Sequence, residues 1–499
     1  MMHSKRFQRW LLALWLCVGV GLRLYDLTDL PLDFHPVRQV RALILARALY
    51  LPPESEAALA AQAQAQREAL IEPPLMEGLT ALTYRLLGQE LPWVGRLYAI
   101  LFWVWGAWGV FLLARRTAGG LVGAWAALAY FLFLPYAIQA SRSFQPDPLL
   151  TASIVWAVWA ALRWQDAPQS WGRMLLAGLL AGLALLVKSV AVFFVAAAWL
   201  GVLLAEGWPG LARQLRSLRL WLAVLLAALP LTIFLLYGLV WTQRMAGQFS
   251  LRFFPALWVQ PSFYWLWLQK ISQTAGLPWV ALAGVGVWLI AERKLRALLL
   301  GAWVGYFLYG AAFAYHITTH DYYQLPLLAL TAISLAAVVQ LLFTALAATP
   351  WLGKAKAALV VSLIGLSLCA LGSANALYAL RKTDYRPQAA FWAQVGQAIG
   401  PNERVLALTQ DYGYPLVYWG WRTCDSWFSA GDFEYRALAG NPLDVREMFA
   451  ERVQGQDIFL VTDFEEWRRQ PELQQLLQAY PLRVQTDAVY IFDLKEGQR

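Results

Sequence analysis

The sequence predicts a polytopic α-helical membrane protein with a small α/β domain outside the membrane. Hydrophobic residues make up 60% of the 499 residues and charged residues only 14%, whereas a soluble domain is typically about 45–50% apolar and about 25% charged. The mean hydropathy is +0.48. These values exclude a soluble globular enzyme and a disordered chain, because both need far more polar sequence.

Long apolar runs predict about eleven transmembrane helices, since roughly 20 apolar residues cross a bilayer. Residues 174–206 form a run too long for one helix at about 1.5 Å per residue, and Lys188 interrupts it, so we divide it into two spans. The start of the chain has no small-residue cleavage site, so the first span is expected to be retained. The predicted spans are 8–25, 93–114, 120–137, 148–164, 171–187, 189–206, 220–240, 278–291, 297–315, 323–347 and 357–379.

The distribution of basic residues predicts the orientation. If the N-terminus is cytoplasmic, the inner segments carry fifteen Lys and Arg against three Asp and Glu, with Glu206 counted at the edge of 207–219, as the positive-inside rule requires. The net charge of +9 then reflects these segments, and we expect no nucleic-acid partner. The prediction is a multi-pass plasma-membrane protein whose first outer loop (26–92) and C-terminal tail are extracytoplasmic. The inner segments are 1–9, 115–119, 163–173, 207–219, 292–296 and 348–356.

The tail, residues 385–499, has ordinary polar content and predicts an α/β domain. The chain would therefore divide into a membrane domain (1–380) and an extracytoplasmic domain (385–499). We expect the latter to fold alone and without a disulfide, because Cys424 is the one cysteine in polar sequence. Strands are predicted at 404–410, 415–421, 457–463 and 488–494, and helices at 387–399, 444–454 and 464–478.

Ionisable and aromatic residues gather at the outer ends of the predicted spans. Such residues are costly within or beside a membrane, so their placement is informative. For any single residue, a solvent-exposed position at the end of a loop is as good an explanation as a functional role. Together they could close a cleft at the outer membrane surface. The set is Asp33, His35, Arg38, Glu72, Arg142, Asp147, Lys188, His316, His320, Asp321, Tyr322 and Tyr323.

The order of motifs resembles a known family over residues 8–350. PLDFHPVR, EPPL, SRSFQPDPLL, GLALLVK and the late helix entry YYQLP follow one another. This order resembles the GT-C fold glycosyltransferases that use polyprenyl-phosphate sugars, a superfamily of protein O-mannosyltransferases and lipid A aminoarabinose transferases (glycosyltransferase family 39-like). The resemblance implies a GT-C-like fold and an inverting hexosyl- or pentosyltransferase. Its partners would be the bilayer, a polyprenyl-phosphate-sugar donor and a lipid, glycan or protein acceptor.

The resemblance also implies roles for individual residues. The first outer loop of the family reads PLxF-Asp-Glu-x-Arg, with the Asp as the proposed base; here His35 stands at the Asp position and Asp33 lies two residues earlier. Asp33 and His35 are therefore the candidate catalytic bases, singly or as a pair. Arg38, Arg142 and Lys188 are the candidates for binding the donor phosphate.

The remaining residues are candidates for acceptor binding or support: Asp147, Glu72, His320, Asp321, Tyr322 and Tyr323. Asp147 followed by Pro148 is equally typical of a helix N-cap. His316 and His320 are four residues apart, so on a helix they share a face and could bind a divalent metal. No cofactor is firmly indicated, and a divalent metal stays open.

Two alternatives compete with a transferase. A transporter or flippase for polyprenyl-linked sugars would place charges near the bilayer midplane, often with internal repeats; a non-catalytic membrane scaffold would leave the outer charges without a role. The aromatic loop 241–277 is expected to lie in the outer interface, as an anchor or as the wall of a donor entry.

Overall fold

The computed structural model describes residues 5–52, 54–245 and 252–495. The chain separates into two compact units. The helical unit comprises 1–27, 69–76 and 94–382, and the α/β unit comprises 28–68, 77–93 and 383–499. The division differs from the predicted boundary, because most of the first outer loop clusters with the tail. Residues 246–251 of the predicted interfacial loop lie outside the described residues.

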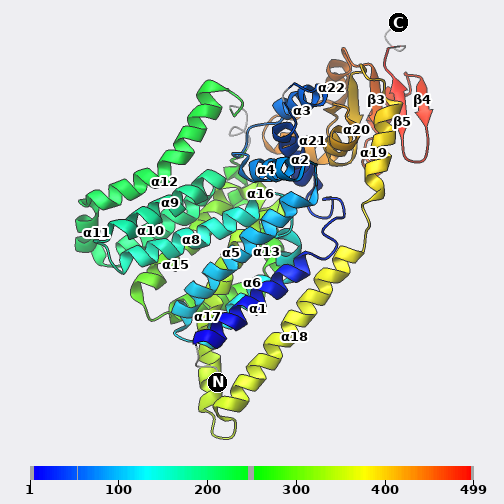
Figure 1. Cartoon of the computed structure of the whole chain (residues 1–499). Coiled ribbons are helices and arrows are strands. Elements are labelled where there is room, and N and C mark those ends of the chain that lie inside the picture. Colours follow the sequence, from blue (N-terminus) through cyan, green and yellow to red (C-terminus); the bar gives the residue numbers. More distant parts are fainter. Residues whose placement is uncertain (1–4, 53, 246–251, 496–499) are drawn as a thin grey trace. The chain divides into compact units, whose positions relative to one another are not determined.

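A helix occupies each of the eleven predicted spans (Figure 1). Among the described residues, five helices are long and apolar enough to cross a membrane, or six if the bent pair α10 and α11 is one span. The number of spans therefore stays a prediction. The helices are α1 (Lys5–Arg23), α5 (Trp93–Ala118), α6 (Leu121–Phe133) with α7 (Pro135–Ala140), α8 (Asp147–Gln165), α9 (Trp171–Val187), α10 (Ala191–Leu204), α11 (Gly207–Leu215), α12 (Leu218–Leu236), α14 (Leu277–Leu289), α15 (Arg293–Ala312), α17 (Leu325–Ala348) and α18 (Gly353–Arg381).

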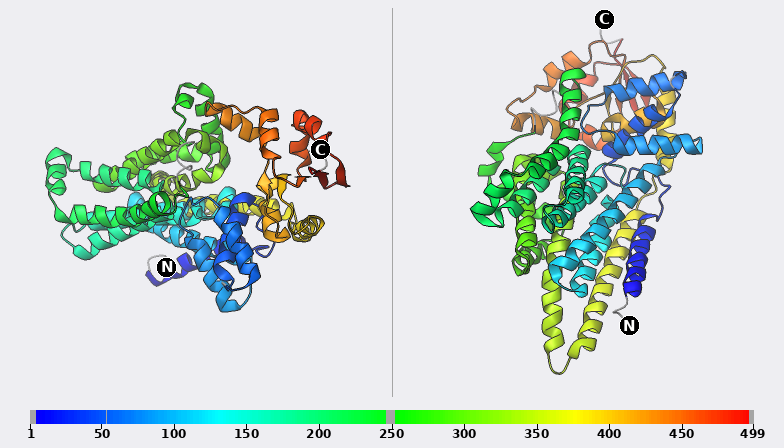
Figure 2. Two further views of the ribbon diagram at one scale, coloured as in Figure 1. Left: turned by 90° about the horizontal axis from the view of Figure 1, so that it is seen from above. Right: turned by 60° about the vertical axis from the view of Figure 1, so that its left-hand side comes forward.

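Small residues let the helices of this unit approach closely. A Cβ atom added to Gly301 of α15 would lie 2.1 Å from the carbonyl oxygen of Ala197 on α10, and one added to Gly201 would lie 2.3 Å from that of Ala297. Such contacts are typical of helix packing in lipid, where burial of apolar surface gives no driving force. Figures 1 and 2 show α17 and α18 as the arms of a hairpin.

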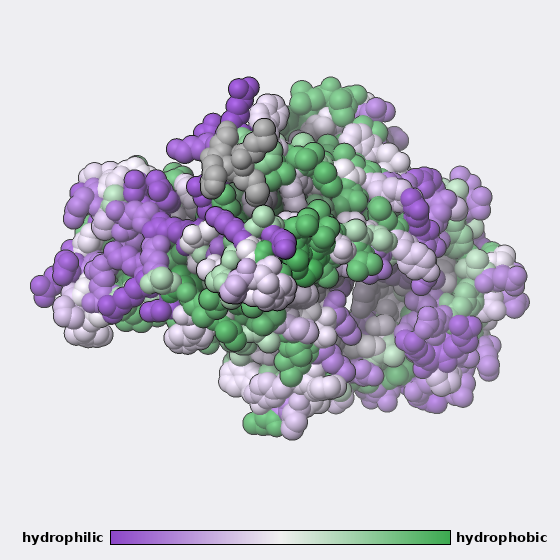
Figure 3. All heavy atoms as spheres, turned by 90° about the horizontal axis from the view of Figure 1, so that it is seen from below, coloured by the Kyte–Doolittle hydropathy of each residue, from purple (hydrophilic) through white to green (hydrophobic). Residues whose placement is uncertain are grey.

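The outer surface of the helical unit is apolar, as a lipid-facing surface must be. Leu229, Ile233 and Leu236 on α12 and Leu363 and Ile364 on α18 are exposed. Figure 3 shows large hydrophobic areas in green beside hydrophilic areas in purple on one face of the molecule.

The predicted inner loops meet at one end of the bundle. The Arg116 guanidinium lies 2.6 Å from Asp166 and 2.5 Å from Glu292, and Lys294 lies 2.9 Å from Glu206. These contacts join three of the segments that the basic residues assigned to one side and the end of the span before a fourth. The grouping of these segments is thus confirmed, while the compartment that each side faces stays a prediction.

The α/β unit is built on a five-stranded sheet of order β2-β1-β3-β5-β4. The strands β2 (Asp425–Ser426), β1 (Val405–Leu408) and β3 (Ile458–Val461) are parallel. Strand β5 (Tyr490–Asp493) pairs antiparallel with β3, and the edge strand β4 (Leu482–Gln485) pairs antiparallel with β5. The strands β1 and β3 are buried along their whole length, which explains their unbroken hydrophobic sequences VLAL and IFLV.

Helices cover both faces of this sheet. One apolar core contains residues of α22 (Val445–Arg452) and α24 (Pro471–Leu477), and the other contains residues of α19 (Pro387–Ala398) and α20 (Tyr414–Gly420). The remaining helices of the unit are α2 (Pro36–Tyr50), α3 (Glu56–Arg67), α21 (Ala430–Leu438), α23 (Phe464–Arg468) and most of α4 (Leu75–Leu87).

Most predicted elements of the tail are confirmed, and one is wrong. Segments 404–410, 457–463 and 488–494 contain β1, β3 and β5, but 415–421 forms the helix α20 rather than a strand. Gly413 has a positive φ of 78° and Pro415 occupies the first helical turn, where its missing N–H is tolerated. The predicted helix 464–478 is divided into α23 and α24, because Pro471 begins a new helix.

Buried polar contacts join the first outer loop to the tail within the α/β unit. The Arg47 guanidinium lies 3.1 Å from the Glu90 carboxylate and donates a 2.6 Å hydrogen bond to the carbonyl oxygen of Tyr418. Glu68 accepts from Arg41 at 3.1 Å and from the Tyr414 hydroxyl at 2.8 Å. The tail therefore shares its buried surface with the loop, and independent folding of residues 385–499 is no longer expected.

Candidate functional site

Lys188 is the centre of a buried ionic cluster in the helical unit. It ends helix α9, and its ammonium nitrogen lies 2.9 Å from Asp147 Oδ1 and 3.8 Å from Glu72 Oε1. The side chains of Lys188, Asp147 and Glu72 are only 8%, 2% and 7% exposed. Two carboxylates around one ammonium leave a net negative charge, which is expensive to bury unless a further cation or ligand compensates it. We call these three residues the lysine cluster.

The position of Asp147 decides between its two interpretations. Pro146 occupies the N-cap of α8, Asp147 is the first helical residue, and its carboxylate accepts a hydrogen bond from Lys188. The N-cap interpretation is therefore wrong. Because Asp147 is part of α8, its carboxylate is held at the N-terminus of a rigid helix, where the helix dipole favours a negative charge.

Aromatic rings complete this site. The Lys188 ammonium lies 5.2 Å from the ring centre of Tyr322 and 5.3 Å from that of Tyr323, close enough for a cation–π attraction. Both tyrosines are buried at the short helix η4 (Asp321–Gln324) that precedes α17. The structure thus brings together Glu72, Asp147, Lys188, Tyr322 and Tyr323, which the sequence placed on separate loops.

The two histidines lie beside these tyrosines. His316, on α16 (Ala314–Thr319), and His320 have ring centres 5.4 Å apart, and His316 stacks on Tyr323 at 5.7 Å. Burial first, and the neighbouring His320 second, lower the pKa of His316 to about 3. His316 is therefore neutral at physiological pH. Among the described residues, no group of three or more His, Cys, Asp or Glu side chains could hold a metal, and metal dependence stays a prediction.

Arg142 is buried and donates hydrogen bonds to backbone carbonyl groups. Its guanidinium donates to the carbonyl oxygens of Tyr25 at 2.7 Å and Asp26 at 3.0 Å, and the residue is 1% exposed. Arg96 in turn donates to the carbonyl oxygens of Arg142 and Leu27. These contacts hold the backbone that leaves α1, and binding of the donor phosphate by Arg142 stays a prediction.

Asp33, His35 and Arg38 belong to the α/β unit, at the start of α2. His35 is the N-cap residue and adopts the left-handed conformation, with φ 46°, which is unusual for a residue other than glycine. Asp33 accepts a 3.3 Å hydrogen bond from Gln39. Since these three residues and the lysine cluster lie in separate units, their predicted convergence stays a prediction.

His35 lies close to a carboxyl group of the tail. Burial first, and then Asp463, raise the pKa of Asp411 to about 6, while the His35 charge opposes the shift. Asp411 follows β1, and Asp463 follows β3. The carboxyl ends of two parallel strands thus face the loop that carries the candidate base.

A small amphipathic pocket adjoins the lysine cluster. Lys188, Glu72 and Arg252 lie on its polar side, and its apolar wall is formed by α12. Its volume of about 30 Å³ has room for little more than a water molecule. The apolar wall consists of Leu231, Phe234 and Leu235, with Leu186 and Met245 beside them.

Comparisons with known proteins agree with this architecture. Residues 71–241 match the family described as dolichyl-phosphate-mannose-protein mannosyltransferase. No curated protein matches the sequence. The matched segment runs from Glu72 and its neighbours to the end of α12 and so includes the whole lysine cluster.

Several solved structures share the fold. ArnT from Cupriavidus metallidurans bound to undecaprenyl phosphate superposes with a TM-score of 0.61 at 16% identity, over 98% of this chain and 98% of that chain. The Archaeoglobus fulgidus oligosaccharyltransferase gives 0.55 at 13% identity, over 92% and 70%. Arabinofuranosyltransferase AftD from Mycobacteria gives 0.51 at 16% identity, over 91% and 35%. These likenesses confirm the predicted GT-C-like fold.

Sequence reasoning missed part of the polar architecture. It did not single out Arg252, which lines the pocket beside Lys188, or the ion pair of the α/β unit between the buried Arg47 and the partly exposed Glu90. The signals in the sequence were an arginine, Arg252, within an aromatic loop and an acid, Glu90, near a predicted span. Neither residue has a sequence spacing that distinguishes a structural or binding role from a position in a solvent-exposed loop.

Proposed function

We propose that the protein is an integral-membrane glycosyltransferase that moves a sugar from a polyprenyl-phosphate donor to an acceptor at the outer face of the membrane. The observation that carries the proposal is the buried lysine cluster beside an apolar wall, within the segment that matches the mannosyltransferase family. A phosphate joined to a prenyl chain needs a cation and an apolar groove side by side.

The donor would bind with its phosphate near Lys188 and Arg252 and its prenyl chain along α12. The phosphate brings negative charge to Lys188, which already pairs with Glu72 and Asp147, so one carboxylate must turn away or exchange partners when the donor binds. The α12 side chains must also move, since the pocket is too small for a lipid headgroup as it stands. Leu231, Phe234 and Leu235 can make room by adopting other rotamers.

Lys188 would act by electrostatic stabilisation. As the bond from the sugar to the phosphate breaks, charge grows on the departing phosphate, and a fixed cation in a water-poor site lowers the energy of that state. Asp147 and Glu72 hold the ammonium in place. The acceptor hydroxyl or amine would lose its proton to Asp33 or His35, as the resemblance implies, and attack the sugar opposite the phosphate with inversion.

The neighbouring structures support a lipid-phosphate donor. The ArnT structure holds undecaprenyl phosphate, and an Archaeoglobus fulgidus enzyme structure holds dolichol-phosphate and an inhibitory peptide. The charged residues of the lysine cluster lie at helix ends rather than within the spans, with Asp147 at the start of α8 and Lys188 at the end of α9. This placement favours a transferase over a transporter with sites at the midplane. We further propose that the transferred sugar is a hexose or a pentose.

Binding of undecaprenyl phosphate tests the proposal. The purified chain in nanodiscs should bind this lipid, as seen by native mass spectrometry, and should bind undecaprenol far less. Arg252→Gln should weaken lipid-phosphate binding about tenfold or more, the loss expected for one charge-assisted contact. The matched control Arg244→Gln, from the same loop but outside the pocket lining, should bind as the wild type does. Equal binding of undecaprenol and its phosphate would contradict the proposed donor site.

A further inference from the structure

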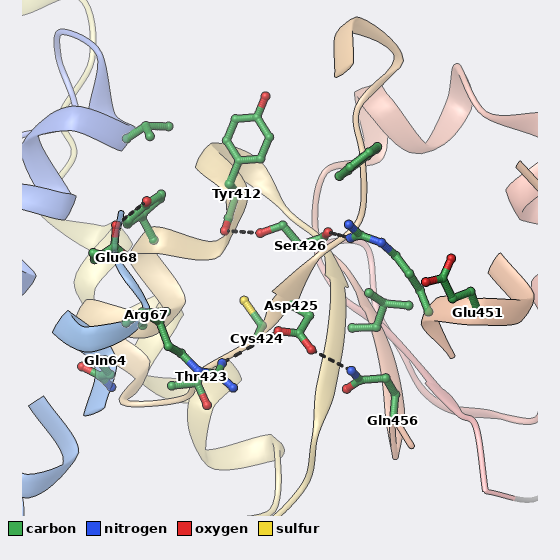
Figure 4. A pocket seen from close by; sticks show the side chains of 16 residues that line it. Gln64, Arg67, Glu68, Tyr412, Thr423, Cys424, Asp425, Ser426, Glu451 and Gln456 are labelled. Atoms are coloured by element: carbon green, nitrogen blue, oxygen red, sulfur yellow. Dashed lines mark hydrogen bonds and ion pairs between the residues drawn. The ribbon is translucent and has the colours of Figure 1, made fainter. Parts of the chain in front are cut away.

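A second and larger pocket lies entirely within the α/β unit. Its volume is about 890 Å³, within the range of about 300–1,000 Å³ that holds organic ligands in proteins. It is formed between the end of α3, the turn after β1, the edge strand β2 and the end of α22 (Figure 4). We call it the α3 pocket.

Buried amide groups of this pocket have unused hydrogen-bonding capacity. Gln64 is 4% exposed, and its Oε1 atom finds no hydrogen-bond partner among the described residues. The Oε1 atom of Gln456 is likewise buried and unpartnered within the described part of the chain, although its Nε2 donates to Asp425 at 2.8 Å. A buried polar atom without a partner destabilises the fold. Both side chains line the pocket, so rotation of either amide would bring its Oε1 atom to a hydroxyl donor of a ligand.

The charges of the pocket favour a neutral ligand. Its ionic side chains are Arg67, Arg452, Glu68, Asp425 and Glu451. Arg41 pairs with Glu68 from outside the lining, so the positive and negative charges balance. Arg67 lies 3.9 Å from Asp425, and Arg452 donates to the Ser426 carbonyl and stacks over the Phe428 ring at 4.3 Å. Because both guanidiniums already have partners and the charges balance, the pocket has no excess of positive charge to attract a phosphate or another anion.

The same contacts argue against a peptide added to the sheet. The edge strand β2 is two residues long, and its Ser426 carbonyl oxygen already accepts a hydrogen bond from Arg452. Strand addition needs a row of free backbone groups along an edge. The pocket is equally unsuited to thiol catalysis, because burial, reinforced by Asp425, raises the pKa of Cys424 to about 12.

Planar polar groups beside an exposed aromatic ring suit a saccharide. Carboxylate, amide and guanidinium groups each offer two atoms to neighbouring hydroxyls, as vicinal diols require. Tyr412 is 44% exposed, and its ring can pack on the apolar face of a sugar. Its left-handed backbone, with φ 55°, is held by the hydrogen bond from Ser426 to its carbonyl oxygen at 2.8 Å.

We infer that the α3 pocket binds a neutral oligosaccharide, the glycan acceptor of the proposed transferase. The assignment of the bound glycan as the acceptor rests on the proposed function. Binding of a saccharide in the pocket does not depend on it. Hydroxyl groups of the glycan donate to the Oε1 atoms of Gln64 and Gln456, and Tyr412 packs against one ring.

The test is direct saccharide binding by the full chain in nanodiscs. An array of short neutral oligosaccharides is probed with the labelled protein, with sugar phosphates and peptides as comparison probes. The best-bound oligosaccharide is then titrated by calorimetry against the wild type, Gln456→Ala and Tyr412→Asn; asparagine tolerates the left-handed backbone. Each substitution should weaken binding about tenfold, equivalent to one good contact. Gln454→Ala, an exposed neighbour outside the pocket lining, is the matched control and should leave binding unchanged.

The outcomes separate this inference from the proposed function. Failure to bind any neutral oligosaccharide, preferential binding of sugar phosphates or peptides, or binding that both pocket variants leave intact would overturn the inference, even if undecaprenyl phosphate binds. Saccharide binding by the wild type that both variants lose would support the α3 pocket as a saccharide site. If the chain then proves not to bind undecaprenyl phosphate, only the role of the pocket as the acceptor site fails.

Discussion

The ammonium nitrogen of Lys188 lies 2.9 Å from the Asp147 carboxylate, and both side chains are buried. The two residues are 41 positions apart, at the end of α9 and the start of α8. Their contact joins the end of one apolar helix to the beginning of another. It therefore serves both the packing of the helical unit and the charge balance of the candidate donor site.

Removal of the lysine charge should destabilise the helical unit. Lys188→Met leaves Asp147 and Glu72 buried without their cation, a change that typically costs about 3–5 kcal/mol. Lys294→Met is the matched control, because Lys294 pairs with Glu206 while both are about one-third exposed, and such pairs contribute about 0–1 kcal/mol. Thermal unfolding in detergent micelles measures both variants. Equal melting temperatures for the two would show that the lysine cluster is not a buried ionic centre.

Stability of the α/β unit should depend on pH through Asp411. Its folded-state pKa is raised to about 6, so the folded state holds this proton more tightly than the unfolded state does. The resulting stability is fully present below about pH 4, the ordinary Asp value, and is lost as the pH rises through about 6. The shift of about two units corresponds to a loss of up to about 3 kcal/mol.

The variant Asp411→Asn should remove this dependence and raise the melting temperature at pH 7, since asparagine is neutral and accepts the left-handed backbone. The matched control is Asp487→Asn, at an exposed position, which should melt as the wild type does. Melting temperatures of the full chain between pH 4.5 and 7.5 provide the comparison. An unchanged pH profile in Asp411→Asn would contradict the assignment.

The first outer loop should be required for a stable tail. Arg47→Ala removes the contact with Glu90, the hydrogen bond to the Tyr418 carbonyl and the stacking on Trp421 at 4.3 Å. Because the partly exposed Glu90 then loses its charged partner, we expect the free energy of unfolding to fall by about 1–3 kcal/mol and proteolysis after residue 383 to become faster. The control is Arg446→Ala, whose exposed pair with Glu472 should contribute little. Equal protease resistance of the two variants would argue that the tail folds without the loop.

The sequence predicted the helices well because an apolar run must be helical in lipid, whatever its neighbours. It also found Lys188, Asp147 and Tyr322, since charges and aromatic residues at span ends stand out against apolar sequence. It could not show that Arg142 holds the backbone after α1, because a buried structural arginine and a phosphate-binding one have the same sequence context. PLVYWGW illustrates a different limit, since alternating hydrophobic residues suit a strand until Gly413 and Pro415 start a helix.

Topology is open to a direct experiment. We predict a cytoplasmic N-terminus, because the inner loops that meet around Arg116 carry the basic excess. A reporter that is active only outside the cytoplasm should give signal when fused after Arg499 and none when fused at Arg116. The reverse pattern would place the lysine cluster on the cytoplasmic side and remove the argument for transfer at the outer face.

Consumption of a polyprenyl-phosphate sugar tests the central claim most directly. Membranes containing the chain are supplied with radiolabelled undecaprenyl-phosphate hexoses and pentoses, and release of undecaprenyl phosphate is measured with matched expression of each variant. The wild type should turn over at least one donor, and either Asp33→Asn or His35→Gln should lower the rate about 10²–10⁴-fold, the range for loss of a general base. The larger effect identifies the base. Wild-type membranes that release no undecaprenyl phosphate from any donor, or a double variant Asp33→Asn/His35→Gln that releases it at the wild-type rate, would contradict the account.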